Sequence, residues 1–145
     1  MMSFAATGRT DEVARLRRAM RNAAKGKESN AAMTREVGLP LADGLASFAN
    51  KCYMEAIAAI EPVRDTANLF GGSHAQRDLL TLTLIDASIR TGDGRRAQHY
   101  IAERLMHKPT AWSERLLMRS RRAERTPASV ITGATIASDQ LAMQS

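Results

Sequence analysis

The sequence has 145 residues, a formal net charge of +6, a single cysteine and only 4% aromatic residues. This length fits one domain with a modest core, and the lone Cys52 excludes an internal disulfide and a CxxC metal or redox site. No segment approaches the ~18 apolar residues of a membrane span, and the first residues lack the pattern of a signal peptide. We therefore expect a cytoplasmic protein whose core is built from Leu, Ile, Met and Ala.

The charge is distributed unevenly along the chain. Residues 1–30 carry seven basic and three acidic residues, residues 31–93 five and eight, and residues 94–125 nine and three. Two basic flanks suit an acidic partner or nucleic acid, although a solvated basic surface is the simpler interpretation. Since Tyr53, Tyr100 and Trp112 lie far apart and form no stacking platform, nucleic acid is not the partner that the sequence favours.

The N-terminal part predicts one basic helix and a linker. Thr10 is suited to cap a helix that ends near Gly26, with acidic residues next to the positive helix end. Its apolar residues recur at helical spacing, at Val13, Leu16, Met20 and Ala23. Arginines cover much of the remaining circumference, at Arg15, Arg17, Arg18 and Arg21. From Lys27 to Pro40 no periodicity persists, which indicates a linker with one short helical turn at Ala31–Arg35.

The middle of the chain predicts two short helices. The first has its larger apolar residues on one side, at Leu41, Leu45 and Phe48, and small residues at Gly44 and Ser47 that let another helix approach. The second has one row of Tyr53, Ile57 and Ile60, with Ala56 beside it. We expect Pro62 to kink this helix or to end it near Ile60, because its ring excludes a hydrogen bond to the preceding turn.

Three further helices are predicted after residue 73. The first runs to about Arg90 and is apolar over most of its circumference, which is typical of a central, buried helix. A turn at Gly92–Gly94 leads to a helix with Ala97, Tyr100, Ile101 and Leu105 on one side, which Pro109 ends. Thr110 is suited to cap the last helix, whose two sides carry Trp112, Leu116, Ser120 and Ala123 on one and Arg115, Arg119 and Arg122 on the other. The arginine row is either a solvated face or a basic partner face. The tail, residues 126–145, is expected to be flexible or to dock on another surface.

Two of the predicted helix pairs are related by an offset of 41 residues. Aligning Ala56 with Ala97 places Lys51-Cys52 opposite Gly92-Asp93. A small residue early in the second helix, a GD-like turn and a closing proline are features of tetratricopeptide repeats of about 34 residues. Arg104 departs from that pattern, because a small residue is usual at its position, and so does Asn68, where a proline is expected.

Residues 36 to 123 resemble the C-terminal portion of the tetratricopeptide repeat protein 38 family. The resemblance is carried by GGSHAQRD, followed by LID and an ERL…KP segment. It implies a solenoid of stacked helix pairs, usually from chains several times this long, and no established reaction. Here the family's N-terminal repeats are missing, and Lys51-Cys52 replaces its GD turn. A helix pair without its usual neighbour leaves an apolar face, which the N-terminal helix, the tail or a second copy must cover. The missing repeats and the nearly uncharged tail together lead us to expect self-association.

The same GGSHAQRD stretch holds the candidate site, formed by Ser73, His74, Gln76, Arg77 and Asp78. Ser73 and Gln76 fit a capping box, and Asp78 suits the positive helix end. His74 and Asp78 share a side of the helix with Leu82 and Ile85, so these polar groups should face the interior or a groove. We expect Arg77 to pair with Glu55 or Glu61 on the preceding helices. The cluster is interpreted as a structural polar lock, with partner or anion recognition as the alternative and catalysis as a remote one.

We therefore predict an all-α protein of five or six helices in tetratricopeptide-like antiparallel pairs, forming a short right-handed solenoid. The predicted domains are a basic helix and linker (1–35), a repeat domain (36–125) and a tail (126–145). The expected function is non-enzymatic protein or peptide binding, with homo-oligomerisation, no membrane, no metal and no cofactor. The alternatives are an anion-binding or enzymatic role for GGSHAQRD and nucleic-acid binding through the basic helices.

Overall fold

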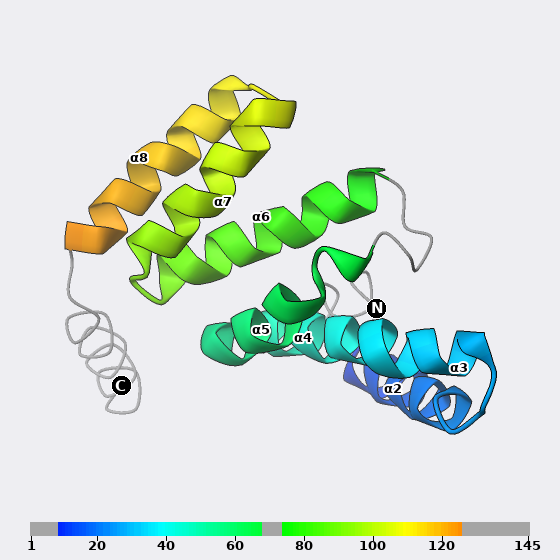
Figure 1. Cartoon of the computed structure of the whole chain (residues 1–145). Coiled ribbons are helices and arrows are strands. Elements are labelled where there is room, and N and C mark those ends of the chain that lie inside the picture. The colour runs from blue at the N-terminus through cyan, green and yellow to red at the C-terminus, as the bar shows by residue number, and fades with distance from the viewer. Residues whose placement is uncertain (1–8, 68–73, 126–145) are drawn as a thin grey trace, which may run out of the picture. The chain divides into compact units, whose positions relative to one another are not determined.

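A computed structural model of the chain describes residues 9–67 and 74–125, and within these ranges every regular element is helical (Figure 1). The elements are α2 (Thr10–Ala23), α3 (Ser29–Met33), η1 (Thr34–Gly38), α4 (Leu39–Ala49), α5 (Tyr53–Ile60), η2 (Glu61–Val63), α6 (His74–Arg90), α7 (Gly94–His107) and α8 (Ala111–Arg125). The structure divides into two compact units, Met1–Ala87 and Ser88–Ser145, with the boundary inside α6. The prediction of an all-α fold built from neighbouring helix pairs is confirmed.

Helix α2 is amphipathic, and its packing side is only half-buried. Val13, Leu16 and Met20 form that side, as their spacing predicts. Arg17 lies at its edge, where its Nε donates to Asp43 Oδ1 of α4 at 2.6 Å. The predicted cap is wrong by one residue, because Arg9 precedes the helix and Thr10 is its first residue, without a side-chain capping bond.

The first turn of α2 is held by charge rather than by a cap. The hydrogen bond from the Arg9 guanidinium lowers the pKa of the Glu12 carboxyl, and nearby Arg15 adds to the effect. Glu12 also lies where the helix dipole favours a negative charge.

The predicted linker between Lys27 and Pro40 is wrong. α3, η1 and α4 follow one another without a break, from Ser29 to Ala49. The intervening η1 is a π-helical turn, which has more residues per turn than an α-helix and so shifts the apolar pattern. One helical period therefore cannot describe both sides of it. Pro40 is the second residue of α4, at the point where the π-helical turn passes into the α-helix. Its missing N–H therefore falls where the hydrogen-bond pattern changes.

Within the first unit, α2 packs against η1 and α4. Arg35 of η1 makes a hydrogen bond to the end of α2. Its Nη1 donates to the carbonyl oxygen of Ala24, the residue that ends α2, at 2.8 Å. The guanidinium thus satisfies a free carbonyl at the negative end of that helix, where a cation is favoured.

α4 and α5 form an antiparallel pair with an apolar contact. A Cβ atom on Gly44 would lie 2.5 Å from Ile60 Cγ1, so the missing side chain is what lets α5 approach. Ile57 and Ile60 of the predicted row on α5 are buried, as is Ala56 beside them, whereas Tyr53 is only half-buried. At the other end of the pair, the Phe48 and Tyr53 rings meet edge to face with centroids 5.6 Å apart. The predicted stripe of α4 is only half-buried, and its buried residues are the small ones, Ala42, Gly44 and Ala46.

The turns at the two aligned positions have the same hydrogen bonds. In the first turn the Cys52 amide donates to Ser47 O at 2.9 Å and the Lys51 amide to Phe48 O at 3.0 Å. In the second, the Asp93 amide donates to Ser88 O at 2.9 Å and the Gly92 amide to Ile89 O at 3.2 Å. Each donor and each acceptor of the first turn corresponds to one in the second turn that lies 41 residues later.

The backbone angles of the two turns agree as well. Lys51 and Gly92 both adopt the left-handed conformation, with φ of 63° and 79°. The residues that follow, Cys52 and Asp93, have φ of −81° and −83° and ψ of 69° and 72°. A repeated turn geometry at one offset supports the internal repeat that the sequence predicts.

α6 is buried over more than half of its circumference. Its buried residues are Leu80, Thr83, Leu84, Ile85, Ala87 and Ser88. The predictions that this helix is buried and runs to Arg90 are confirmed, although Leu82 and Ile89 of the expected stripe are only half-buried.

α7 and α8 form the antiparallel pair of the second unit. Gly94 opens α7 against the last turns of α8, where an added Cβ would lie 2.5 Å from the Ser120 carbonyl oxygen and 2.6 Å from Glu124 Cβ. Asp93 caps α7 by accepting from the Arg96 amide at 3.0 Å. α7 ends at His107, before Pro109, and Thr110 Oγ1 accepts from the Ser113 amide at 3.3 Å, so the predicted ends and cap are confirmed.

Candidate functional site

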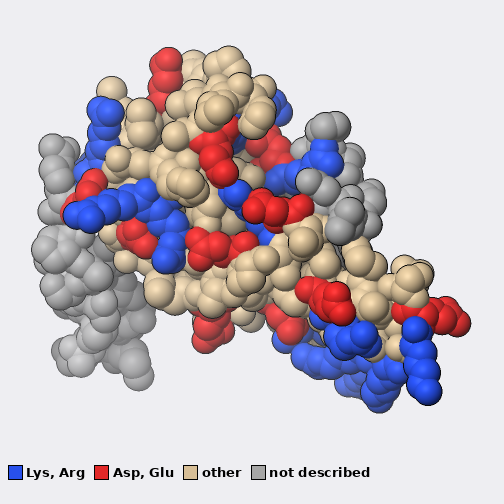
Figure 2. All heavy atoms as spheres, viewed as in Figure 1, with Lys and Arg blue, Asp and Glu red and all other residues tan. Residues whose placement is uncertain are grey.

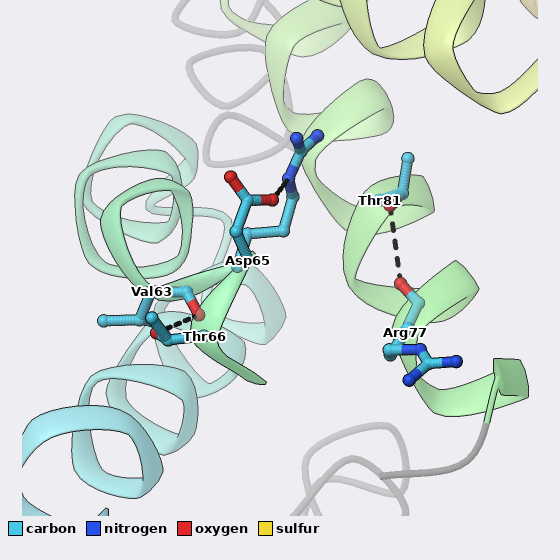
Figure 3. A network of polar contacts seen from close by, with 6 residues as sticks. Val63, Asp65, Thr66, Arg77 and Thr81 are labelled. Carbon is cyan, nitrogen blue, oxygen red and sulfur yellow. Dashed lines mark hydrogen bonds and ion pairs between the residues drawn. The ribbon is translucent and has the colours of Figure 1, made fainter. Parts of the chain in front are cut away.

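The structure reaches only part of the predicted GGSHAQRD cluster. Ser73 and the side chains of His74 and Gln76 lie outside the described residues, so the capping box stays a prediction. Arg77 and Asp78 are half-buried in the first turns of α6, and the Arg77 carbonyl accepts from Thr81 Oγ1 at 3.4 Å. In Figure 3 the Arg77 side chain points away from the segment that contains Val63 and Thr66.

Two carboxylates of the first unit have partners of their own. Glu55, one of the two expected for Arg77, accepts a hydrogen bond from Ser47 Oγ at 3.4 Å. Asp65 pairs with Arg64 at 3.1 Å, and the Arg64 side chain is only 17% exposed (Figure 3). The pairing of Arg77 with Glu55 or Glu61 stays a prediction, as does any chemistry at His74.

A polar cluster that the sequence did not predict lies where α7 meets α8. Arg104 is buried, and its Nη1 donates to Ser113 Oγ at 2.5 Å. Ser113 is 0% exposed, and its hydroxyl also lies 3.0 Å from Thr110 Oγ1. The guanidinium carbon of Arg104 lies 5.3 Å from the centroid of the Trp112 ring, within cation–π range.

This cluster fixes the start of α8. Arg104 contacts Trp112 and Ser113, while Thr110 bonds both the hydroxyl and the amide of Ser113. Trp112 is nevertheless 42% exposed, so the indole is supported from within and open to solvent elsewhere. The only sequence signal for this arrangement was that Arg104 stands where the repeat pattern expects a small residue.

The outward face of α8 continues from this tryptophan. The three arginines of the predicted row, Arg115, Arg119 and Arg122, are all exposed, and Met118 beside them is 76% exposed. The opposite side is buried at Leu116 and Ser120, as predicted, whereas Trp112 lies at the border between the two sides. We call Trp112, Arg115, Met118, Arg119 and Arg122 the α8 face.

Glu124 holds the far end of the same helix pair. Its carboxylate accepts from Gln98 Nε2 at 3.0 Å and from Arg95 Nε at 3.3 Å. Both contacts join the first turns of α7 to the last turns of α8, close to Gly94. The α8 face is therefore carried by a helix that is fixed at both ends by polar contacts.

His99 and His107 of α7 are both exposed. In the described part of the chain, no group of three or more His, Cys, Asp or Glu side chains is placed to hold a metal ion. Nor does any helix of that part combine the length and the apolar character needed to cross a membrane.

Comparison with known proteins gives no assignment. No protein-family model matches the chain, and no solved structure matches it. The functional conclusion therefore depends on the residues themselves.

Proposed function

We propose that the protein is a non-enzymatic helical repeat module that binds another protein or peptide, and that the α8 face is its binding surface. The observation that carries the proposal is the composition of this face. An exposed tryptophan and an exposed methionine lie beside three exposed arginines. Trp, Met and Arg are enriched in protein interfaces, and Trp and Arg contribute most often to binding energy.

The support beneath Trp112 adds to the argument. Arg104 is buried and lies 5.3 Å from the ring, and it is itself bonded to Ser113. An aromatic side chain that is already ordered loses less entropy on binding than a mobile one. Trp112 is thus suited to be an apolar anchor with arginines next to it.

The chemistry of the face indicates the kind of partner. Arginine binds carboxylates through two parallel hydrogen bonds, and indole pairs with apolar or aromatic side chains. The partner that fits is a peptide or helix that presents acidic residues around an apolar one. The repeated helix pair and the resemblance to the tetratricopeptide repeat protein 38 family support the same class of function, because stacked helix pairs are common scaffolds for peptide binding.

The proposal is tested by quantitative capture from an extract of the cells that produce the protein. The bait is the full chain, either as wild type or as the α8 variant Arg115→Gln/Met118→Gln/Arg119→Gln. The control variant, Arg15→Gln/Arg18→Gln, removes the same number of positive charges from α2. We expect proteins that are retained by the wild type and the control but lost with the α8 variant. Equal retention by all three baits, or none by the wild type, would overturn the proposal.

A second copy of the chain is also proposed as a partner, because self-association is expected from the sequence. Sedimentation velocity from 1 to 100 µM measures it, with the α8 variant as comparison. A monomer throughout this range would contradict self-association. The capture experiment would then decide whether the α8 face binds a different protein.

A further inference from the structure

A second surface, on α2, has a different composition from the α8 face. From Val13 to Lys27 the chain has six basic residues and no acidic one. Arg17 is engaged by Asp43 at 2.6 Å, whereas Arg15, Arg18 and Arg21 are exposed. Figure 2 shows a dense group of basic side chains in this region, at the lower right.

The geometry of these three arginines is simple. They follow one another at intervals of three residues, and a helix places such residues on one side. That side is opposite to Val13, Leu16 and Met20, which face the rest of the first unit. Lys25 and Lys27, both exposed, continue the positive charge beyond the end of the helix. We call Arg15, Arg18, Arg21, Lys25 and Lys27 the α2 face.

Apolar anchors are missing from the α2 face. The other exposed residues on this side of the helix are Ala14, Ala19 and Asn22. The larger apolar residues of α2 lie on its packing side. A protein interface needs a desolvated apolar centre, and insertion into a membrane needs large apolar side chains directed at the lipid. Binding to single-stranded nucleic acid usually adds aromatic stacking, which α2 cannot provide.

We propose that the α2 face binds the phosphate backbone of duplex nucleic acid, without reading its sequence. A row of guanidinium groups along a helix needs only phosphates spaced along a line, because counterion release supplies most of the affinity of such contacts. Arginine also binds phosphate oxygens in pairs, which suits it to this role. Phosphate binding by the α2 face does not depend on the proposed role of the α8 face, because the two faces have no residue in common.

The test is fluorescence anisotropy of the full chain with labelled 20-base-pair DNA and RNA duplexes, between 50 and 200 mM salt. Three phosphate contacts correspond to a loss of affinity of about forty-fold over that range. We expect Arg15→Gln/Arg18→Gln/Arg21→Gln to lower the slope of log affinity against log salt by about three, and each single variant to lower it by about one. Circular dichroism checks that the variants keep their helices. If the triple variant loses its helical structure, the salt dependence of the single variants decides the result.

The control is Arg115→Gln/Arg119→Gln/Arg122→Gln, which removes the same charge from α8 and should keep the slope. Two competitors identify the kind of ligand, poly-L-glutamate for acidic proteins and vesicles with one-fifth phosphatidylserine for membranes. The proposal is overturned by no binding to either duplex at 50 mM salt. It is equally overturned by equal losses in both triple variants, or by either competitor binding as tightly as the duplexes. A preference for DNA or for RNA identifies the source of the phosphates.

Discussion

The α4–α5 and α7–α8 pairs both bring two helices close together at a glycine, but the second pair also buries polar side chains. Each pair has a glycine where its helices come closest, Gly44 in the first and Gly94 in the second. Around Gly44 the contact is apolar, with Ile60 and Ala56 fully buried. The α7–α8 pair buries apolar residues too, such as Ile101 and Leu116, but adds Arg104, Ser113 and Ser120 to them. A buried arginine must offset its own desolvation, so it adds less to stability than an apolar residue would. What Arg104 does provide is a fixed contact with Trp112.

Ile60→Ala has the largest expected effect on the apolar pair. The side chain is fully buried against Gly44, so its removal leaves a cavity. We expect a loss of about 3 to 4 kcal/mol in the free energy of unfolding. Urea unfolding followed by circular dichroism measures it, and a loss below about 1 kcal/mol would show that the contact is not tightly packed.

Gly94→Ala is the most damaging small change in the polar pair. The added Cβ would meet backbone atoms of α8, the Ser120 oxygen at 2.5 Å and the Glu124 nitrogen at 2.9 Å. Backbone of a packed helix cannot turn aside as a side chain can, so we expect about 2 to 3 kcal/mol of destabilisation. Thermal unfolding at wild-type level would contradict the close approach of α7 and α8.

Arg104→Met separates the packing role of Arg104 from its charge. Methionine keeps an unbranched apolar stem but loses the hydrogen bond to Ser113 and the contact with Trp112. We expect a loss of about 1 to 2 kcal/mol, because removing the buried charge offsets part of the lost bonds. Trp112 is the only tryptophan, so its fluorescence should also change. The same spectrum in Arg104→Met and wild type would disprove the support of the indole.

Gly44→Ala should cost less than Gly94→Ala, because the added Cβ meets the Ile60 side chain rather than backbone at its shortest contact. Helix propensity favours alanine and offsets part of the clash, which leaves about 1 kcal/mol. In an Ile60→Ala background the two shortest contacts disappear and only the Ala56 oxygen at 3.2 Å remains close, so Gly44→Ala should cost less there than in the wild type. A double-mutant cycle measures this coupling, and additive effects would place the two residues out of contact.

The smallest expected effect concerns the repeated turn. Lys51 holds a left-handed φ of 63°, the conformation that Gly92 supplies without strain at the equivalent position. Lys51→Gly should therefore gain up to about 1 kcal/mol, despite the entropy of glycine in the unfolded chain. Gly92→Ala should lose a similar amount. Opposite signs in thermal unfolding support the equivalence of the two turns, and equal signs would oppose it.

The helices and their ends were largely predictable because local chemistry sets them. Pro62 ends α5 at Ile60, Thr110 caps α8, and an offset of 41 residues relates the two turns. The continuous helix from Ser29 to Ala49 was missed because its π-helical turn breaks the period on which sequence patterns depend.

The candidate sites differ in how far the sequence could locate them. The arginine row of α8 is exposed, as helical spacing predicts, because periodicity alone sorts the sides of a helix. The bond between Arg104 and Ser113 crosses a turn between two helices, and no pattern along either helix encodes it. The only sequence signal was that Arg104 stands where the repeat pattern expects a small residue. This signal did not identify Ser113 as its hydrogen-bond partner.

The central claim, that the α8 face binds protein, is tested most directly by site-specific photo-crosslinking. A benzophenone amino acid replaces Met118, which is 76% exposed on the α8 face, or Met54, which is 62% exposed on α5. In an extract of the cells that produce the protein, we expect discrete covalent adducts from position 118 that position 54 does not give. Indistinguishable adducts from both positions, or none from position 118, would contradict it.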